Sequence, residues 1–207
     1  MQWWMRNCEN LDKAIFDGVG TFDIPQMTPE HIVCGEFIGF NQAKGYHDPT
    51  SVGVHFFLDD YQFSRCWTAV ELYMPMLSKF RCVCTPDFSL YTDFPLAVQI
   101  YNHYRKHWLG AYWQLCGLTV IPSVSWSDER SYDWCFDGDP VGGTVAISSV
   151  GTQMNAQSRR LFMQGYNQML TRLEPETILF HGTVPEGCRG HIVQLPAYQR
   201  RLRNLEK

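Results

Sequence analysis

Three aspartates follow two apolar runs of the chain and could together perform acid-base chemistry or hold a metal ion. Asp59 and Asp60 end the run 52–58, and Asp87 follows the run 81–84. If the two runs are neighbouring parallel strands, about 4.8 Å apart, their carboxylates can share a pocket. Asp59 and Asp87 could then bind Mg²⁺, or one carboxyl could act as acid and another as base near neutral pH. The alternative is that these aspartates only cap turns and helices.

Other polar residues also lie after or within the apolar runs of the chain. Thr85 and Ser89 flank Asp87, and His181 directly follows another apolar run. His181, or His55 within an earlier run, could serve as a general base or a metal ligand. A histidine in a strand is more often a core residue with its hydrogen bonds satisfied, so both interpretations stay open.

A turn at 148–152 could bind an anion. Its small and hydroxyl-bearing residues are Ser148, Ser149, Gly151 and Thr152. The turn leads into a helix-patterned segment, and the start of a helix presents free amides to anions such as phosphate. Arg159 and Arg160 lie in the first turns of that segment, where their charge opposes the helix dipole unless an anion is near. A solvated helix start with two exposed arginines is the alternative.

Aromatic residues make up 14% of the chain, and seven of them are Trp. Trp126 ends a further apolar run between two serines. Its ring could stack on a base or a sugar, or simply pack in the core.

The composition restricts the class of protein. With 207 residues, 45% hydrophobic and 18% charged, the sequence is typical of one globular domain. A net charge of −4 argues against a surface that attracts nucleic acid everywhere, although a local basic patch remains compatible with it. The eight cysteines form no C-x-x-C pair, which favours reduced core thiols. No signal peptide or membrane span is apparent, so we expect a cytoplasmic protein in a bacterial host, without membrane contact.

Seven apolar runs predict strands that alternate with helical patterns. The runs begin at Ile32, Val52, Arg81, Leu118, Thr144, Thr177 and His191. Helices are expected over 92–117 and 155–173, and a poorer one over 61–79 that Pro75 interrupts. Alternation implies parallel strands with right-handed crossovers. A complete eight-stranded barrel usually needs about 250 residues. We therefore predict an α/β fold, a trimmed or irregular TIM-barrel-like arrangement of about six to seven mainly parallel strands, with an open doubly wound sheet as the alternative.

Residues 1–207 are predicted to form this single domain, with an aromatic segment, 1–31, packed on it and a basic tail helix at 197–207. The helix over 92–117 should bury an apolar stripe. The stripe consists of Ala97, Ile100, Tyr101, Tyr104, Trp108, Ala111, Tyr112 and Leu115. Polar residues should lie on its other faces; they are Asn102, His103, Arg105 and Lys106.

Several motifs resemble an uncharacterised family found largely in phages, prophages and other bacterial mobile elements. The motifs are Gly53-Val-His-Phe-Phe-Leu-Asp-Asp-Tyr-Gln-Phe, Thr85-Pro-Asp-Phe-Ser-Leu-Tyr, Trp113-Gln, Val120-Ile-Pro-Ser and Cys135-Phe-Asp-Gly. They are similar to domain-of-unknown-function family 4417, over roughly residues 22–182. The resemblance implies a mobile-element setting and assigns no activity, cofactor or catalytic residue.

These observations support two classes of function. The first is a phage or prophage enzyme that acts on a nucleotide or the end of a nucleic acid, by hydrolysis or glycosyl-type transfer at the aspartate cluster. The second is a non-catalytic anti-defence protein that sequesters a nucleotide signal or inhibits a host defence or replication protein. A DNA-binding accessory is less favoured, because the chain is acidic and has no helix-turn-helix or zinc motif.

Overall fold

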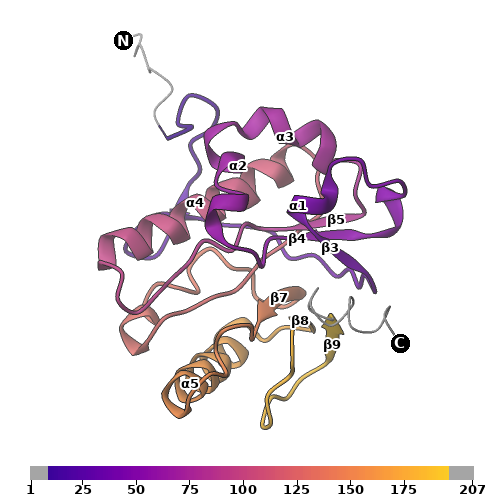
Figure 1. The fold of residues 1–207 in the computed structure, drawn as a ribbon. Helices are drawn as coiled ribbons and strands as arrows, with labels where there is room; N and C mark the ends of the chain where they lie inside the picture. The colour runs from indigo at the N-terminus through magenta and orange to yellow at the C-terminus, as the bar shows by residue number, and fades with distance from the viewer. Residues whose placement is uncertain (1–8, 196–207) are drawn as a thin grey trace, which may run out of the picture.

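The computed structural model describes residues 9–195, which form a mixed α/β fold with two parallel sheets (Figure 1). The first sheet contains β3 (Phe37–Gly39), β4 (Gly53–His55), β5 (Cys82–Cys84) and β6 (Val120–Ile121). The second sheet contains β7 (Thr144–Ser148), β8 (Thr177–His181) and β9 (Ile192–Leu195). All neighbouring strands in both sheets are parallel. The predicted α/β class, with mainly parallel strands, is confirmed.

The strands lie side by side in the order in which they occur in the chain. A single parallel bridge, between Ser123 and Ala146, joins the end of the first sheet to β7 of the second. Within residues 9–195 no ladder joins β9 back to β3, so the strands do not form a closed barrel. Their order also never reverses in this part of the chain, as it would at the switch point of a doubly wound sheet.

The helices of the described chain connect these strands. They are α1 (Phe40–Ala43), α2 (Arg65–Thr68), α3 (Val70–Leu77), α4 (Leu96–Leu115) and α5 (Ala156–Leu173), with short 3₁₀ turns at Pro49–Ser51, Asp60–Gln62 and Glu129–Ser131. The helix expected over 61–79 breaks at Ala69, whose backbone angles are not helical, and Pro75 lies inside α3. No helix between residues 9 and 195 is long and apolar enough to cross a membrane.

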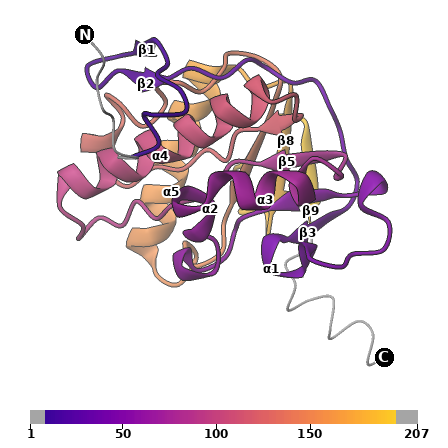
Figure 2. The ribbon, with the colours of Figure 1, turned by 90° about the horizontal axis from the view of Figure 1, so that it is seen from above.

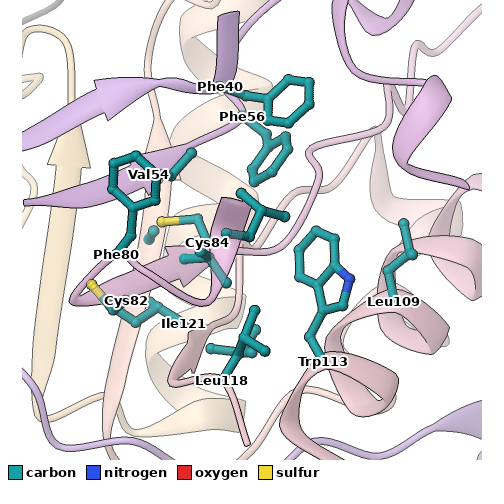
Figure 3. Close-up of a cluster of buried hydrophobic side chains, with 14 of the residues drawn as sticks. Phe40, Val54, Phe56, Phe80, Cys82, Cys84, Leu109, Trp113, Leu118 and Ile121 are labelled. Carbon is teal, nitrogen blue, oxygen red and sulfur yellow. The ribbon is translucent and has the colours of Figure 1, made fainter. Parts of the chain in front are cut away.

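Two hydrophobic clusters stabilise the fold, one against each sheet. In the first, side chains of α4 lie in one cluster with those of β4, β5 and β6; Figure 3 shows Trp113 of α4 beside Phe56, with Phe40 next to Phe56. In the second, alternate residues of β7 and β8 face α5. The other inward residues of the second sheet, Ala146, Leu179 and Leu195, belong to the first cluster. Side chains therefore connect the two sheets more extensively than the backbone does.

Helix α4 buries a different face from the one that its apolar stripe predicts. Its buried polar residues are Gln99, Asn102, His103, Lys106 and His107. By contrast, Leu115 of the predicted stripe is 68% exposed. The polar face can be buried because its groups have partners: Asn102 donates to the Ser89 carbonyl (2.7 Å), and the Lys106 ammonium donates to the Ser123 carbonyl (2.9 Å).

A buried histidine-carboxyl pair holds the 132–140 segment against α4. His107 Nε2 lies 3.0 Å from Asp139 Oδ1, and both side chains are fully buried. His107 Nδ1 lies 3.0 Å from the His103 carbonyl. Both ring nitrogens of His107 therefore face oxygens, which gives this buried imidazole a polar partner on each side.

Residues that precede the first sheet pack on α4, where the hairpin of β1 (Gly18–Val19) and β2 (Ile24–Pro25) runs beside the helix (Figure 2). The Trp108 indole donates to the Ala14 carbonyl at 3.1 Å. The Thr28 backbone exchanges two hydrogen bonds with the Gln114 side chain. Residues 1–8 of the predicted aromatic segment and the predicted tail at 197–207 lie outside the described residues.

Candidate functional site

A cavity of about 710 Å³ opens at the carboxyl ends of β4, β5, β6 and β7. The loop after each of these strands contributes to its lining, and the first turns of α5 complete it. The lining includes seven of the residues singled out from the sequence: Asp59, Asp87, Ser89, Trp126, Ser148, Gly151 and Thr152. The structure therefore brings most of the predicted rim residues together around one volume.

Asp87 is the half-buried carboxyl of the lining. Burial raises the pKa of Asp87 to about 6, although the nearby charge of Lys106 acts in the opposite direction. Lys106 is only 1% exposed, so its charge approaches from the protein side. The Ser125 hydroxyl also lowers this pKa, yet its Oγ is buried without a well-formed hydrogen bond. The result is a carboxyl that can take up and release a proton near neutral pH.

The two consecutive aspartates have different surroundings. Asp59 is exposed and lines the cavity. Asp60 lies outside the lining, and its carboxylate accepts hydrogen bonds from the Ser89 amide (3.2 Å) and the Ser89 hydroxyl (2.8 Å). Asp60 thus ties the loop after β4 to the loop after β5. The structure places it as a support for the cavity wall.

The predicted metal site has few protein ligands in the described chain. Between residues 9 and 195, no three His, Cys, Asp or Glu side chains are grouped as ligands of one metal ion. A Mg²⁺ ion here would depend on Asp59 and Asp87 together with oxygens of a ligand and water, which is a common way for proteins to hold this ion.

Thr85 lies outside the described lining of the cavity. It is fully buried, and its Oγ1 accepts a hydrogen bond from the Ser123 amide at 2.8 Å. The Ser123 hydroxyl in turn donates to the Thr85 carbonyl at 2.7 Å. This exchange extends the β5–β6 pairing beyond the strand ends and uses the hydroxyl that the sequence suggested for ligand binding.

Trp126 forms part of an aromatic wall. Its ring lies 5.5 Å from that of Phe162, measured between centroids, and both residues line the cavity. The ring rests on Gly165 of α5, where any Cβ would overlap it. Glycine at this helical position lets the indole approach the backbone, at the cost of a weaker local helix preference.

The turn at 148–152 lines the cavity but offers fewer free amides than the sequence suggests. The Ser149 amide donates to the His181 carbonyl (3.1 Å), and the Thr152 amide donates to the Ser149 carbonyl (3.1 Å). The Val150 amide donates to the Ser148 hydroxyl at 3.2 Å. The Ser149 hydroxyl points elsewhere and donates to the Thr183 carbonyl at 2.6 Å.

The start of α5 is also occupied by its own side chains. Asn155 and Ser158 form a capping box, in which the Ser158 amide donates to Asn155 Oδ1 at 2.8 Å. Arg159 and Arg160 are exposed and do not belong to the described lining. Arg159 Nη1 instead donates to the Gln153 carbonyl at 3.2 Å. Arg159 thus lies next to the end of the turn, while neither arginine is among the described lining residues of the cavity.

His181 lies outside the described lining, at the end of β8. It is 5% exposed; its ring centroid is 4.7 Å from that of His55 and 5.1 Å from that of Phe57, which lines the cavity. Its Nδ1 lies 3.2 Å from the Ser148 hydroxyl. Burial lowers the pKa of His181 to about 4, so the imidazole is neutral at physiological pH. His55 accepts a hydrogen bond from the Phe57 amide through Nδ1, at 3.3 Å.

We expect His181 to make the fold sensitive to acid. Its ordinary pKa is 6.5 and its pKa in the fold is about 4, so between these values the unfolded chain binds a proton that the native state does not. Stability from this residue is present above pH 6.5 and decreases by on the order of 3 kcal/mol as the pH falls to about 4. Urea denaturation of wild type and His181→Gln at pH 7 and pH 4 measures this effect. The variant should gain relative stability at pH 4, and a pH-independent difference would contradict the assignment.

The family model for a domain of unknown function, DUF4417, matches residues 16–199. The chain belongs to this family. It is 37% identical over 172 residues to the Gene 1 protein of Mycobacterium phage L5, an alignment that covers 82% of this chain and 75% of that protein. It is also 37% identical to the Gene 1 protein of Mycobacterium phage D29, over 82% of this chain and 64% of the relative. No solved structure matches the chain. The predicted resemblance to a family with phage members is confirmed.

The family match includes every described segment of the cavity, from the loop after β4 to the start of α5. Sequence reasoning missed several lining residues in these segments: Phe57, Gln62, Ser125, Ser127, Ser158 and Phe162. Ser125 and Ser127 flank Trp126, so their position after a strand was an available signal. Phe162 had none, because an apolar residue on the inner stripe of a helix is expected to be core.

Proposed function

We propose that the cavity binds a nucleotide or the end of a nucleic acid, and that Asp87 transfers a proton to or from it during hydrolysis or glycosyl-type transfer. The observation that carries this proposal is the position of Asp87, a half-buried carboxyl on the cavity wall with a pKa of about 6. A general acid or base works best when its pKa is close to the working pH. The proposed setting is a phage-related protein that acts in the cytoplasm of a bacterial host.

The shape of the fold supports a ligand site at this edge. We infer that the two sheets form a trimmed, irregular barrel, because the strands follow chain order and the rings of His55 (β4) and His181 (β8) meet across the interior. Three strands, β5, β6 and β7, lie between these residues, and in a flat sheet they would hold the two rings much farther apart than 4.7 Å. In parallel α/β folds, catalytic groups come from loops at the carboxyl ends of the strands, as the cavity residues do here.

Product analysis tests the proposal. The purified protein is incubated with nucleoside monophosphates, their deoxy forms and a single-stranded oligonucleotide, with and without Mg²⁺, and the mixture is resolved by mass spectrometry. New products in amounts above one per protein molecule indicate turnover. A ligand that is bound and recovered unchanged would instead support the sequestering protein, and no binding at all would contradict both.

Trp126 should supply much of the affinity for such a ligand. Stacking of a base on an aromatic side chain contributes about 1–3 kcal/mol. Trp126→Ala is therefore expected to weaken binding of the best nucleotide by about tenfold or more, as measured by calorimetry. Trp126→Phe, which retains a stacking face, is the matched control and should lose much less. Equal affinity of wild type and Trp126→Ala would show that the ligand does not stack on this wall.

A further inference from the structure

We infer that the bond broken in this cavity is the N-glycosidic bond between the base and the sugar of a nucleotide, and that phosphoester bonds are left intact. This inference rests on the proposed function of the same cavity and specifies its substrate chemistry. It follows from three properties of the lining: its charge, its aromatic residues, and the Ser125 hydroxyl near Asp87.

The charge of the lining is negative. Asp59 and Asp87 contribute carboxyls, and among the lining residues that the structure describes there is no Lys, Arg or His. Enzymes that transfer phosphoryl groups stabilise the phosphate with cations. A phosphate placed beside Asp59 would meet a carboxyl and no cation of the lining. A sugar that becomes positively charged in the transition state would meet opposite charge.

Cleavage of a glycosidic bond develops positive charge of this kind. Its transition state resembles an oxocarbenium ion, and a pair of carboxyls normally serves it. The aromatic lining residues, Phe57, Tyr91, Trp126 and Phe162, provide faces for the neutral base. The Ser125 hydroxyl lies beside Asp87 and lowers its pKa, so it favours the ionised carboxyl that forms after proton transfer.

The reaction can be written with Asp87 as the proton donor. The protonated carboxyl of Asp87 gives its proton to a nitrogen of the base as the bond from C1′ of the sugar to the base breaks, and the bonding electrons leave with the base. The carboxylate of Asp59 faces the positive sugar. The oxygen of a water molecule bonds to C1′, and the ionised Asp87 takes one proton from that water. The products are the free base and the sugar phosphate, and both carboxyls end as they began.

A positively charged sugar analogue tests whether the lining attracts a cationic sugar, and this test needs no known substrate. Iminoribitol carries a positive charge at its ring nitrogen, whereas anhydroribitol is its neutral counterpart. Wild-type protein is expected to bind iminoribitol at least about tenfold more tightly than anhydroribitol, and Asp59→Asn should reduce that ratio to about threefold or less. Asp59 is exposed and its side chain caps no backbone amide, so the variant should fold. Exposed Asp133, outside the lining, provides the control Asp133→Asn, which should keep the wild-type ratio.

The outcomes separate this inference from the proposed function. Free base among the products supports both. Inorganic phosphate or a dephosphorylated nucleoside would overturn the N-glycosidic inference while leaving Asp87 as a proton-transfer residue. Equal binding of the two sugar analogues, or tighter binding of orthophosphate than of iminoribitol, would also overturn it. An intact nucleotide that binds without turnover overturns both.

Discussion

Asp139→Ala is expected to lower the free energy of unfolding by about 3–5 kcal/mol, because it removes one partner from a fully buried pair. His107 Nε2 faces Asp139 Oδ1 at 3.0 Å, and neither side chain has any exposed surface. Without Asp139, Nε2 of His107 loses the oxygen that it faces and stays buried without that partner. Urea denaturation at pH 7 measures the loss.

Asp139→Asn is the matched control for this pair. An asparagine can donate to His107 Nε2, while His107 Nδ1 still donates to the His103 carbonyl, so one neutral arrangement satisfies both ring nitrogens. The Asn variant should therefore be clearly more stable than the Ala variant. If Asp139→Ala costs less than about 1 kcal/mol, the pair is not the buried anchor of the 132–140 segment.

In contrast to Asp139→Ala, Asp87→Asn should raise the free energy of unfolding of the ligand-free protein at pH 7. In the fold the pKa of Asp87 is about 6, against an ordinary value of 3.8, because burial disfavours the carboxylate. The native state then binds a proton more readily than the unfolded chain, so stability from this group is complete below about pH 4 and is lost as the pH rises through 6. Asparagine, which cannot ionise, should gain on the order of 1–3 kcal/mol at pH 7 and nothing at pH 4. Urea denaturation at both values measures the difference.

The same substitution should abolish product formation, since asparagine has no proton to exchange at neutral pH. Replacement of a purely structural residue would have a different result: it would destabilise the fold, and the molecules that remain folded would still form product. Asp133→Asn, at an exposed site, should change neither stability nor turnover. Destabilisation of Asp87→Asn at pH 7 would show that the interaction with Lys106 outweighs burial.

The strands could be predicted because each is a compact apolar run. Every strand of the two parallel sheets begins within five residues of a predicted start. For example, β3 begins at Phe37 where Ile32 was predicted, and β7 begins at Thr144 as predicted. Helix α4 was less predictable. Its side chains Asn102, Lys106 and His107 are polar, and only tertiary partners such as the Ser89 and Ser123 carbonyls allow their burial. Periodicity does not contain that information.

The lining of the cavity was predictable where its residues directly follow a predicted strand. Asp59, Asp87 and Trp126 each follow an apolar run, and all three line the same space. Asp60 and Thr85 have the same sequence signature, yet their polar atoms bond Ser89 and Ser123 of neighbouring loops. The difference is the direction in which a side chain leaves an irregular loop, which depends on φ and ψ at each position. No regular spacing determines those angles in a loop.

The cavity lies beside the single backbone bridge that joins the two sheets. Two backbone hydrogen bonds, from Ala146 to the Pro122 carbonyl and from Val124 to the Ala146 carbonyl, both 2.8 Å, make up that bridge. The cavity has walls on both sides of it, with Ser125 from one sheet and Ser148 from the other. Parting the sheets here would break little main-chain bonding, so the two sheets are held together mainly by side-chain packing, including that of Ala146, Leu179 and Leu195 in the first cluster. A ligand that contacted cavity residues of both sheets would add to this packing, and its affinity would depend on how firmly the two sheets are already held together.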